Sequence, residues 1–99
     1  MKYTVTIRAK LREGQTAAKK YHDDVTRATK AAARQAGDLT HAVYLDPKDP
    51  RAFLGIDTWG NLEGLQKFAG SPDIRDFFGE LFDGEPEVRV WVDSDWNQW

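Results

Sequence analysis

One of the two histidines in this chain has a position that could support proton transfer. His41 alternates in phase with Leu39, Val43 and Leu45, which places it on an apolar face of an extended segment. An unpaired imidazole there would have a lowered pKa and could act as a base near neutral pH. The same position also suits a hydrogen-bonded histidine of the core or of a subunit interface. The sequence leaves both interpretations open.

The other histidine, His22, directly follows Tyr21 in a segment with helical spacing. If Tyr21 faces the core, His22 lies about 100° further round the helix, near the edge of the buried stripe. Both residues are candidate contacts for a ligand. A half-exposed surface histidine is the simpler interpretation of His22, because histidine is usually intermediate in burial.

Asp57 is a carboxylate in the middle of an apolar extended run, where it needs a partner. It is in phase with Trp59. If that face looks into a cavity, Asp57 could be a catalytic base. If the face looks to the edge of the sheet, Asp57 pairs with Arg8 or Arg89, and we favour this second interpretation.

Aromatic side chains and one amide could complete a pocket. The indole of Trp59 could wall a flat ligand, and the amide of Asn61 could donate to an oxyanion. Core packing explains Trp59 equally well, and helix capping is a sufficient explanation for Asn61. Phe77 and Phe78 belong to an apolar helix face and are expected mainly in the core, where they could still line a cavity.

Composition excludes several classes of function. The chain has 99 residues, no cysteine and a net charge of −2. Disulfides, thiolate metal sites, iron–sulfur clusters and cysteine nucleophiles are therefore excluded, and a partner held through nucleic-acid phosphates or a basic membrane-binding face is not expected. The acidic residues after position 72 have no histidine among them and are expected to form a solvated face without a metal. The first ten residues lack the apolar run of a signal peptide and no run is long enough to span a membrane, so we expect a cytoplasmic protein.

The elements that must position these residues are read from periodicity and turn residues. Gly37, Gly70 and the DPKDP turn interrupt the chain, while Asn61 and Ser71 can cap helices and Pro72 suits a first helical turn. We expect strands at 3–10, 39–45, 51–59 and 87–93, a helix at 15–36, and a second helix in two pieces at 62–69 and 72–82. The buried stripe of the first helix is expected to consist of Ala18, Tyr21, Val25, Ala28, Ala32 and Ala36, with Lys19, Lys20, Asp23, Asp24, Arg27 and Lys30 mostly on its solvated side.

This order predicts one α+β domain over residues 1–99, of ferredoxin-like β-α-β-β-α-β topology, which includes a C-terminal tail at 94–99. Two helices would cover one face of a four-stranded antiparallel sheet. We expect the other face to carry some combination of Tyr44, Phe53, Trp59 and Trp91. An aromatic face of this kind needs a cover, which predicts a homodimer with Trp96 and Trp99 packed on the partner subunit.

The segment IDTWGNLEGLQKFAGSPDIRDFF, residues 56–78, resembles the antibiotic biosynthesis monooxygenase-like family. The resemblance lies in Trp59, the NLEGL run, the Ser71-Pro72 break and Phe77-Phe78. It implies a dimeric α+β barrel and relatives that include cofactor-independent oxygenases of quinols and polycyclic aromatics, haem-degrading oxygenases and proteins without known activity. Many relatives carry a histidine where Phe68 stands here. In the haem-degrading branch that histidine ligates iron, so Phe68 argues against haem degradation.

Three functions follow as hypotheses. The first is a monooxygenase that needs no cofactor and binds a small, flat, apolar aromatic, with His41 or Asp57 as base and Asn61 as polar anchor. Trp59 and Phe77 would wall its pocket. The second is a non-catalytic, ligand-binding or stress-associated dimer of the same fold. The third, haem binding, would have only His22 and His41 as axial ligands.

Overall fold

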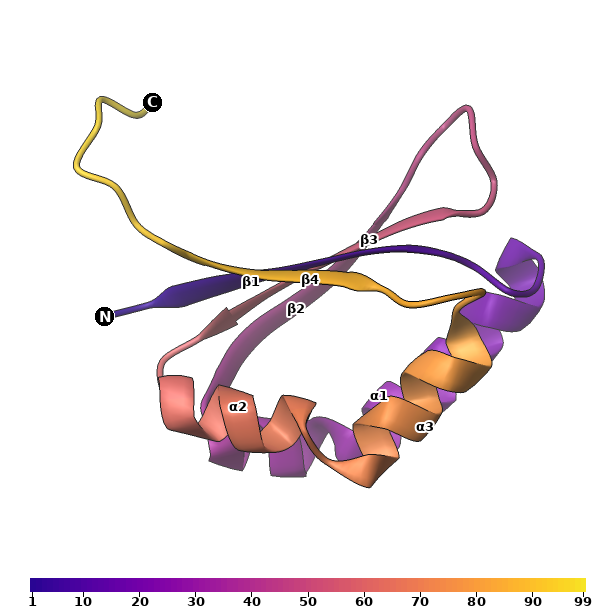
Figure 1. Ribbon diagram of the computed structural model, residues 1–99, viewed down its shortest axis with the longest axis horizontal. Coiled ribbons are helices and arrows are strands. Elements are labelled where there is room, and N and C mark those ends of the chain that lie inside the picture. Colours follow the sequence, from indigo (N-terminus) through magenta and orange to yellow (C-terminus); the bar gives the residue numbers. More distant parts are fainter.

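All 99 residues are described by a computed structural model (Figure 1). Four strands and three helices follow one another in the order that the sequence pattern predicts. No helix combines the length and the apolar character needed to cross a membrane. The elements are β1 (Tyr3–Lys10), α1 (Gln15–Ala36), β2 (Asp38–Leu45), β3 (Ala52–Trp59), α2 (Leu62–Ala69), α3 (Pro72–Leu81) and β4 (Glu87–Val92).

The helix ends are formed by the residues that the sequence marks. Gly37 ends α1 in the left-handed region, with φ of 114°, and donates its N–H to the carbonyls at the end of the helix. The Asn61 side chain accepts the N–H of Gly64 at 3.1 Å, and the Ser71 hydroxyl accepts the N–H of Ile74 at 3.3 Å. Both residues therefore cap helices, as predicted.

The strands form one antiparallel sheet in the order β2-β3-β1-β4. All three helices lie on the same side of it (Figure 1). Residues that are paired across antiparallel strands share a face. His41, Asp57, Val5 and Val90 form one such row. Since Val5 is buried in the core, this whole row belongs to the helix-facing side. The predicted α+β, ferredoxin-like fold is confirmed.

The core consists of two apolar clusters at opposite ends of the helix-facing side. The hairpin cluster lies where α3 ends against β1 and β3 and comprises Leu11, Ala18, Phe53, Leu81 and Phe82. The Trp59 cluster lies at the other end, beneath α2, and comprises Val5, Trp59 and Leu65. Between these two clusters the sheet carries Gly55 and Asp57 in place of large apolar residues.

Two expectations about side-chain faces are wrong in part. Phe53 and Trp59 lie under the helices and are buried, so only Tyr44 and Trp91 remain on the open face of the sheet. In α1, Ala28 and Ala32 are exposed, whereas Thr29 and Ala33, each one position further along, are half-buried. An interval of three or four residues fits several neighbouring stripes on an alanine-rich helix, so spacing alone could not select the correct one.

The C-terminal tail extends away from the helices (Figure 1). Trp96 is 81% exposed and Trp99 is fully exposed, so neither indole packs on its own domain. Packing of the tail on a partner subunit stays a prediction. The ends of three strands also differ by one residue from expectation, because β2 begins at Asp38, β3 begins at Ala52 and β4 ends at Val92.

Candidate active site

A cleft of about 1220 Å³ lies between the helix-facing side of the sheet and the three helices. Its apolar walls come from Trp59 on β3, from Phe68 on α2 and from Phe77 and Phe78 on α3. Trp59 is only 2% exposed and its ring packs against that of Phe68 at a centroid distance of 5.5 Å. Rings arranged in this way suit a flat apolar ligand.

Three ionisable side chains line the same cleft near its β2–β3 side: Asp38, His41 and Asp57. The His41 and Asp57 side chains lie side by side because these residues are paired across the two strands. Nδ1 of His41 is 2.7 Å from Oδ1 of Asp57. A carboxylate that accepts from an imidazole N–H is a strong, charge-assisted pair, so the cleft contains a coupled acid–base pair.

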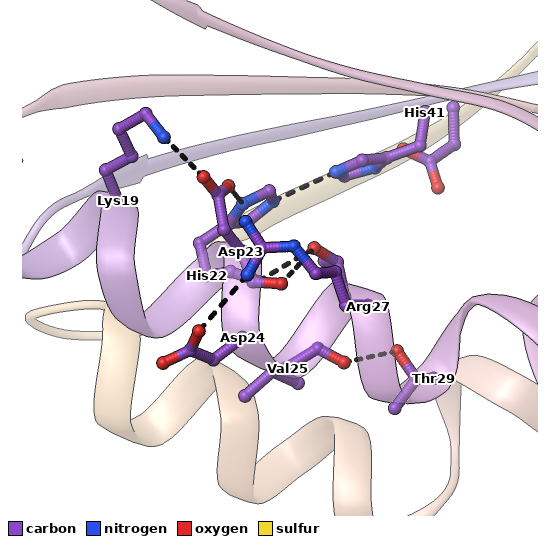
Figure 2. A network of polar contacts seen from close by, with 10 residues as sticks. Lys19, His22, Asp23, Asp24, Val25, Arg27, Thr29 and His41 are labelled. Atoms are coloured by element: carbon purple, nitrogen blue, oxygen red, sulfur yellow. Dashed lines mark hydrogen bonds and ion pairs between the residues drawn. The ribbon is translucent and has the colours of Figure 1, made fainter.

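The pair continues into α1 through a second histidine. Nε2 of His41 is 2.9 Å from Nε2 of His22, and Nδ1 of His22 is 3.0 Å from Oδ1 of Asp23. Asp23 in turn accepts a hydrogen bond from Lys19. Figure 2 shows the dashed contacts running from Lys19 through Asp23 and His22 to His41. We call Asp23, His22, His41 and Asp57 the proton string.

His22 is fixed in place by its surroundings. Its side chain is 13% exposed, and its ring lies over the ring of His41, with centroids 5.1 Å apart and planes 19° from parallel. Phe53 and Phe77 contact the ring at 6.4 and 6.1 Å between centroids. His22 is therefore not the half-exposed surface residue that the sequence favoured.

The charges of the proton string shift two of its pKa values. The hydrogen bond to Asp57 raises the pKa of His41 against the opposing effect of burial, and the nearby carboxylates add to the increase. Hydrogen bonds from Lys19 and then from His22 lower the pKa of Asp23 to about 2. His41 is therefore beside a carboxylate that favours its protonated form.

Asp38 is the unusual group of the site. It is 9% exposed, and its Oδ1 has no hydrogen-bond partner. Burial, followed by the neighbouring charge of Asp57, raises the pKa of Asp38 to about 7. A carboxyl group that lines a cleft and exchanges its proton near neutral pH has the character of a functional acid or base.

A family model described as antibiotic biosynthesis monooxygenase matches residues 2–80 of the chain. The chain belongs to the antibiotic biosynthesis monooxygenase family. The resemblance seen in residues 56–78 is thereby confirmed. A comparison with curated proteins finds no match.

Solved structures agree with this family fold. SnoaB, a cofactor-independent oxygenase from Streptomyces nogalater, is 13% identical with a TM-score of 0.71, over 95% of this chain and 94% of that one. Rv0793 from Mycobacterium tuberculosis is 19% identical with a TM-score of 0.66, over 99% and 100% of the two chains. A conserved protein from Methanosarcina mazei Go1 is 13% identical with a TM-score of 0.70, over 95% and 94%. At these identities the likeness shows a shared fold.

Within this family fold, the structure brings some of the candidate residues together and separates others. His41, Asp57, Trp59, Phe77 and Phe78 all line the cleft. His22 reaches it through His41. By contrast, the Asn61 side chain is engaged as the cap of α2, and Tyr21 packs against Phe77 in the hairpin cluster, so neither lines the cleft.

The expected ion pair of Asp57 with Arg8 or Arg89 is wrong. Arg8 alternates with the cleft-facing residues of β1 and lies on the open side of the sheet, while Arg89 pairs with Glu87 at 3.1 Å. The register instead places Asp57 beside His41. Haem ligation is also disfavoured, because both ring nitrogens of His22 and of His41 are already hydrogen-bonded.

Two carboxylates of the site are missing from the sequence-based candidates. The helical pattern assigns Asp23 to the solvated side, although its position beside His22 was an available signal. Asp38 follows the glycine that ends α1, and nothing in the local sequence distinguishes it from a loop residue. Its burial results from tertiary packing against β3.

Proposed function

We propose that this protein is a monooxygenase that needs no cofactor and acts on a flat aromatic substrate with an acidic C–H or O–H group, such as an anthrone or a quinol. The observation that carries the proposal is the 2.7 Å pair of His41 and Asp57, placed in a cleft with aromatic walls. Membership in the antibiotic biosynthesis monooxygenase family supports it.

Asp57 is the base in this proposal. Its Oδ1 is held by His41, and the side chain is 14% exposed toward the cleft, so its second oxygen can meet a substrate proton. His41 keeps the carboxylate oriented and stabilises its charge until the substrate arrives. Trp59, Phe68, Phe77 and Phe78 hold the aromatic plane and exclude water from the anion that forms.

The reaction balances without an external reductant. Asp57 removes one proton from the activated CH₂ carbon, and the anion passes one electron to O₂, which gives a substrate radical and superoxide. These combine to a peroxide anion, which takes back a proton. Loss of the second C–H proton together with hydroxide then gives a carbonyl. One oxygen atom of O₂ enters the product and the other leaves as water.

Oxygen uptake with a panel of anthrones and quinols, without added metal or flavin, tests this function. Uptake above the spontaneous rate should fall by about 10²-fold or more in Asp57→Asn, because removal of a positioned base costs that much. Asp46→Asn is the matched control, since Asp46 only accepts backbone N–H groups in the β2–β3 turn. No uptake with any substrate, or equal rates for the two variants, would refute the proposal.

A non-catalytic binding role is the second candidate, and one observation favours it. The only amide proposed as a donor to an oxyanion, Asn61, caps α2 instead. If the protein merely binds aromatics, isothermal titration calorimetry should show binding of the panel compounds while oxygen uptake stays at the spontaneous rate. The affinity should then fall in Phe68→Ala and be unchanged in Asp57→Asn.

We further propose that a second copy of the chain covers the open face of the sheet. This face carries Tyr44 and Trp91, which are 53% and 49% exposed, flanked by half-buried Leu54 and Ile56. Covering the two rings would bury apolar area that the monomer leaves in water. Light scattering should report a dimer for the wild type and a monomer for Trp91→Lys, whereas a monomeric wild type would contradict this expectation.

A further inference from the structure

The two ends of the proton string open in different places. Asp57 and His41 line the cleft. Asp23 instead lines a shallow hollow on the outer surface of α1, together with Lys19 and Lys20. Figure 2 shows His22 between these two sites, with its ring directed toward His41 and Asp23 beside it. The string is thus a continuous polar connection from the cleft to the solvent-exposed surface of α1.

We propose that this string is a proton wire, which carries the proton removed from the substrate by Asp57 through His41 and His22 to Asp23. This inference rests on the proposed function and adds the route by which the proton leaves. Three contacts of 2.7, 2.9 and 3.0 Å make up the route, and each is within hydrogen-bonding distance.

The chemistry of the four groups fixes the number of protons in the wire. A carboxylate oxygen and a bare imidazole nitrogen are both acceptors, so each of the three contacts needs one proton of its own. The complete string therefore holds three protons. One of the three is the proton taken from the substrate: while Asp57 holds it, the other two lie on Nε2 of His41 and on Nδ1 of His22.

Transfer then needs only one turn, of the Asp57 carboxyl group, which brings the substrate proton from its second oxygen to the side of His41. Asp57 passes that proton to the bare Nδ1 of His41. His41 passes its Nε2 proton to Nε2 of His22, and His22 passes its Nδ1 proton to Asp23. One proton disappears from the cleft end and one appears at the surface end, and the number of protons in the string stays at three.

Removal of the proton has a clear benefit once an aromatic substrate fills the cleft and excludes water from it. A proton that stays on Asp57 beside the substrate anion returns to it quickly, because the attraction between them is poorly screened there. Transfer to Asp23, which is beside Lys19 and solvent, separates the charges. The anion then persists long enough to meet O₂, and the same wire can return a proton to the peroxide.

Hydrogen exchange without oxygen tests the wire separately from the oxygen chemistry. Under anaerobic conditions in D₂O, the enzyme should exchange the acidic C–H hydrogens of a bound anthrone for deuterium. His22→Phe keeps the ring between Phe53 and Phe77 and removes both nitrogens, so exchange should fall by roughly 10²-fold. Asp23→Asn should lower it by about tenfold, and added imidazole should restore it by accepting the proton from His22.

Asp24→Asn is the matched control. Asp24 pairs with Lys20 one residue further along α1, as Asp23 pairs with Lys19, but it does not contact a histidine. Exchange should be unchanged in this variant. Equal exchange in Asp23→Asn and Asp24→Asn, or a loss that imidazole does not rescue, would overturn the wire. The proposed function would still stand in that case if Asp57→Asn lowers oxygen uptake.

A measurement on the free protein tests the wire in the case where no substrate gives oxygen uptake. In ¹⁵N NMR of the free protein, the wire requires His22 and His41 to lose their shared proton at one common midpoint, and Asp23→Asn should move the midpoint of both rings. Rings that titrate independently would overturn the wire. A common midpoint without oxygen uptake for any substrate would support the wire and reject the oxygenase function.

Discussion

The hairpin cluster and the proton string lie on the same side of the sheet, yet the cluster consists of apolar side chains and the string of ionisable ones. In the hairpin cluster, Phe82 is 1% exposed and packs on Phe53 with ring centroids 4.9 Å apart. A few residues further along β3, the same face carries Asp57, whose carboxylate is hydrogen-bonded to His41. Apolar clusters at both ends of the sheet supply the stability that lets the middle hold ionisable groups.

The largest loss of stability is expected from a substitution in the hairpin cluster. Phe82→Ala should lower the free energy of unfolding by about 3–5 kcal/mol, because it leaves a cavity among Leu11, Phe53 and Leu81. Urea unfolding followed by circular dichroism measures the loss. Trp91→Ala, a truncation on the open face, should cost much less in the monomer, and an equal cost would mean that the hairpin cluster is not the main source of stability.

At the polar end the expected effect depends on pH. The folded-state pKa of Asp38 is raised to about 7 from an ordinary value of 3.8. The unfolded chain therefore loses this proton first, and the stability of the wild type falls as pH rises from about 4 to about 7. Asp38→Asn removes this loss and should be more stable than the wild type at pH 8 by about 2–4 kcal/mol.

Urea unfolding of Asp38→Asn and of the wild type at pH 4 and pH 8 checks this expectation. The difference between the two proteins should shrink toward pH 4, where Asp38 is protonated in the folded protein and only about half ionised in the unfolded chain. A difference that is independent of pH would mean that Asp38 stays ionised in the folded protein.

The contact between α1 and α2 offers a test of the support beneath the Trp59 cluster. A Cβ added at Gly64 would lie 1.9 Å from the carbonyl oxygen of Ala36, which is backbone and cannot turn away. Gly64→Ala should cost about 1–3 kcal/mol, as overpacking does. Gly79→Ala is the control, because a Cβ there meets nothing within 4 Å and should stabilise α3 by up to about 1 kcal/mol.

The smallest effect concerns the His41–Asp57 pair itself. The hydrogen bond to Asp57 is the main cause of the raised pKa of His41, so Asp57→Asn should lower that pKa, as NMR titration of the ring can show. In the wild type the raised pKa stabilises the folded state below pH 6.5, and this contribution is lost as pH rises through the folded-state pKa. An unchanged pKa of His41 in Asp57→Asn would mean that the hydrogen bond to Asp57 is not the cause of the increase.

Local sequence predicts the fold well, because each element is bounded by residues with a clear backbone preference. The left-handed cap at Gly37 and the capping side chains of Asn61 and Ser71 occur where the sequence marks them. The site is less predictable, because it depends on pairing between strands. His41 meets Asp57 only through the register of β2 on β3, and His22 meets His41 only through the position of α1 across the sheet.

The same limit explains the error over the partner of Asp57. Alternation shows that Asp57 shares a face with Trp59, but the arginines that could reach it cannot be ranked without knowing which strands are neighbours. The role of Asp38 was harder still to predict, because its raised pKa depends on burial by β3 and on the charge of Asp57. His22, His41 and Asp57 could be identified from the sequence as candidates, whereas Asp23, Asp38 and the connections among these groups could not.

The unequal exposure of the four tryptophans makes the protein its own optical sensor. Trp59, buried beside Phe68 in the cleft wall, should emit at short wavelength, whereas the exposed indoles of the tail should emit at long wavelength. A ligand in the cleft would quench the blue edge of the emission, and a partner seated on Trp91 and the tail would shift the red edge. One spectrum could thus separate occupancy of the cleft from assembly of the subunits.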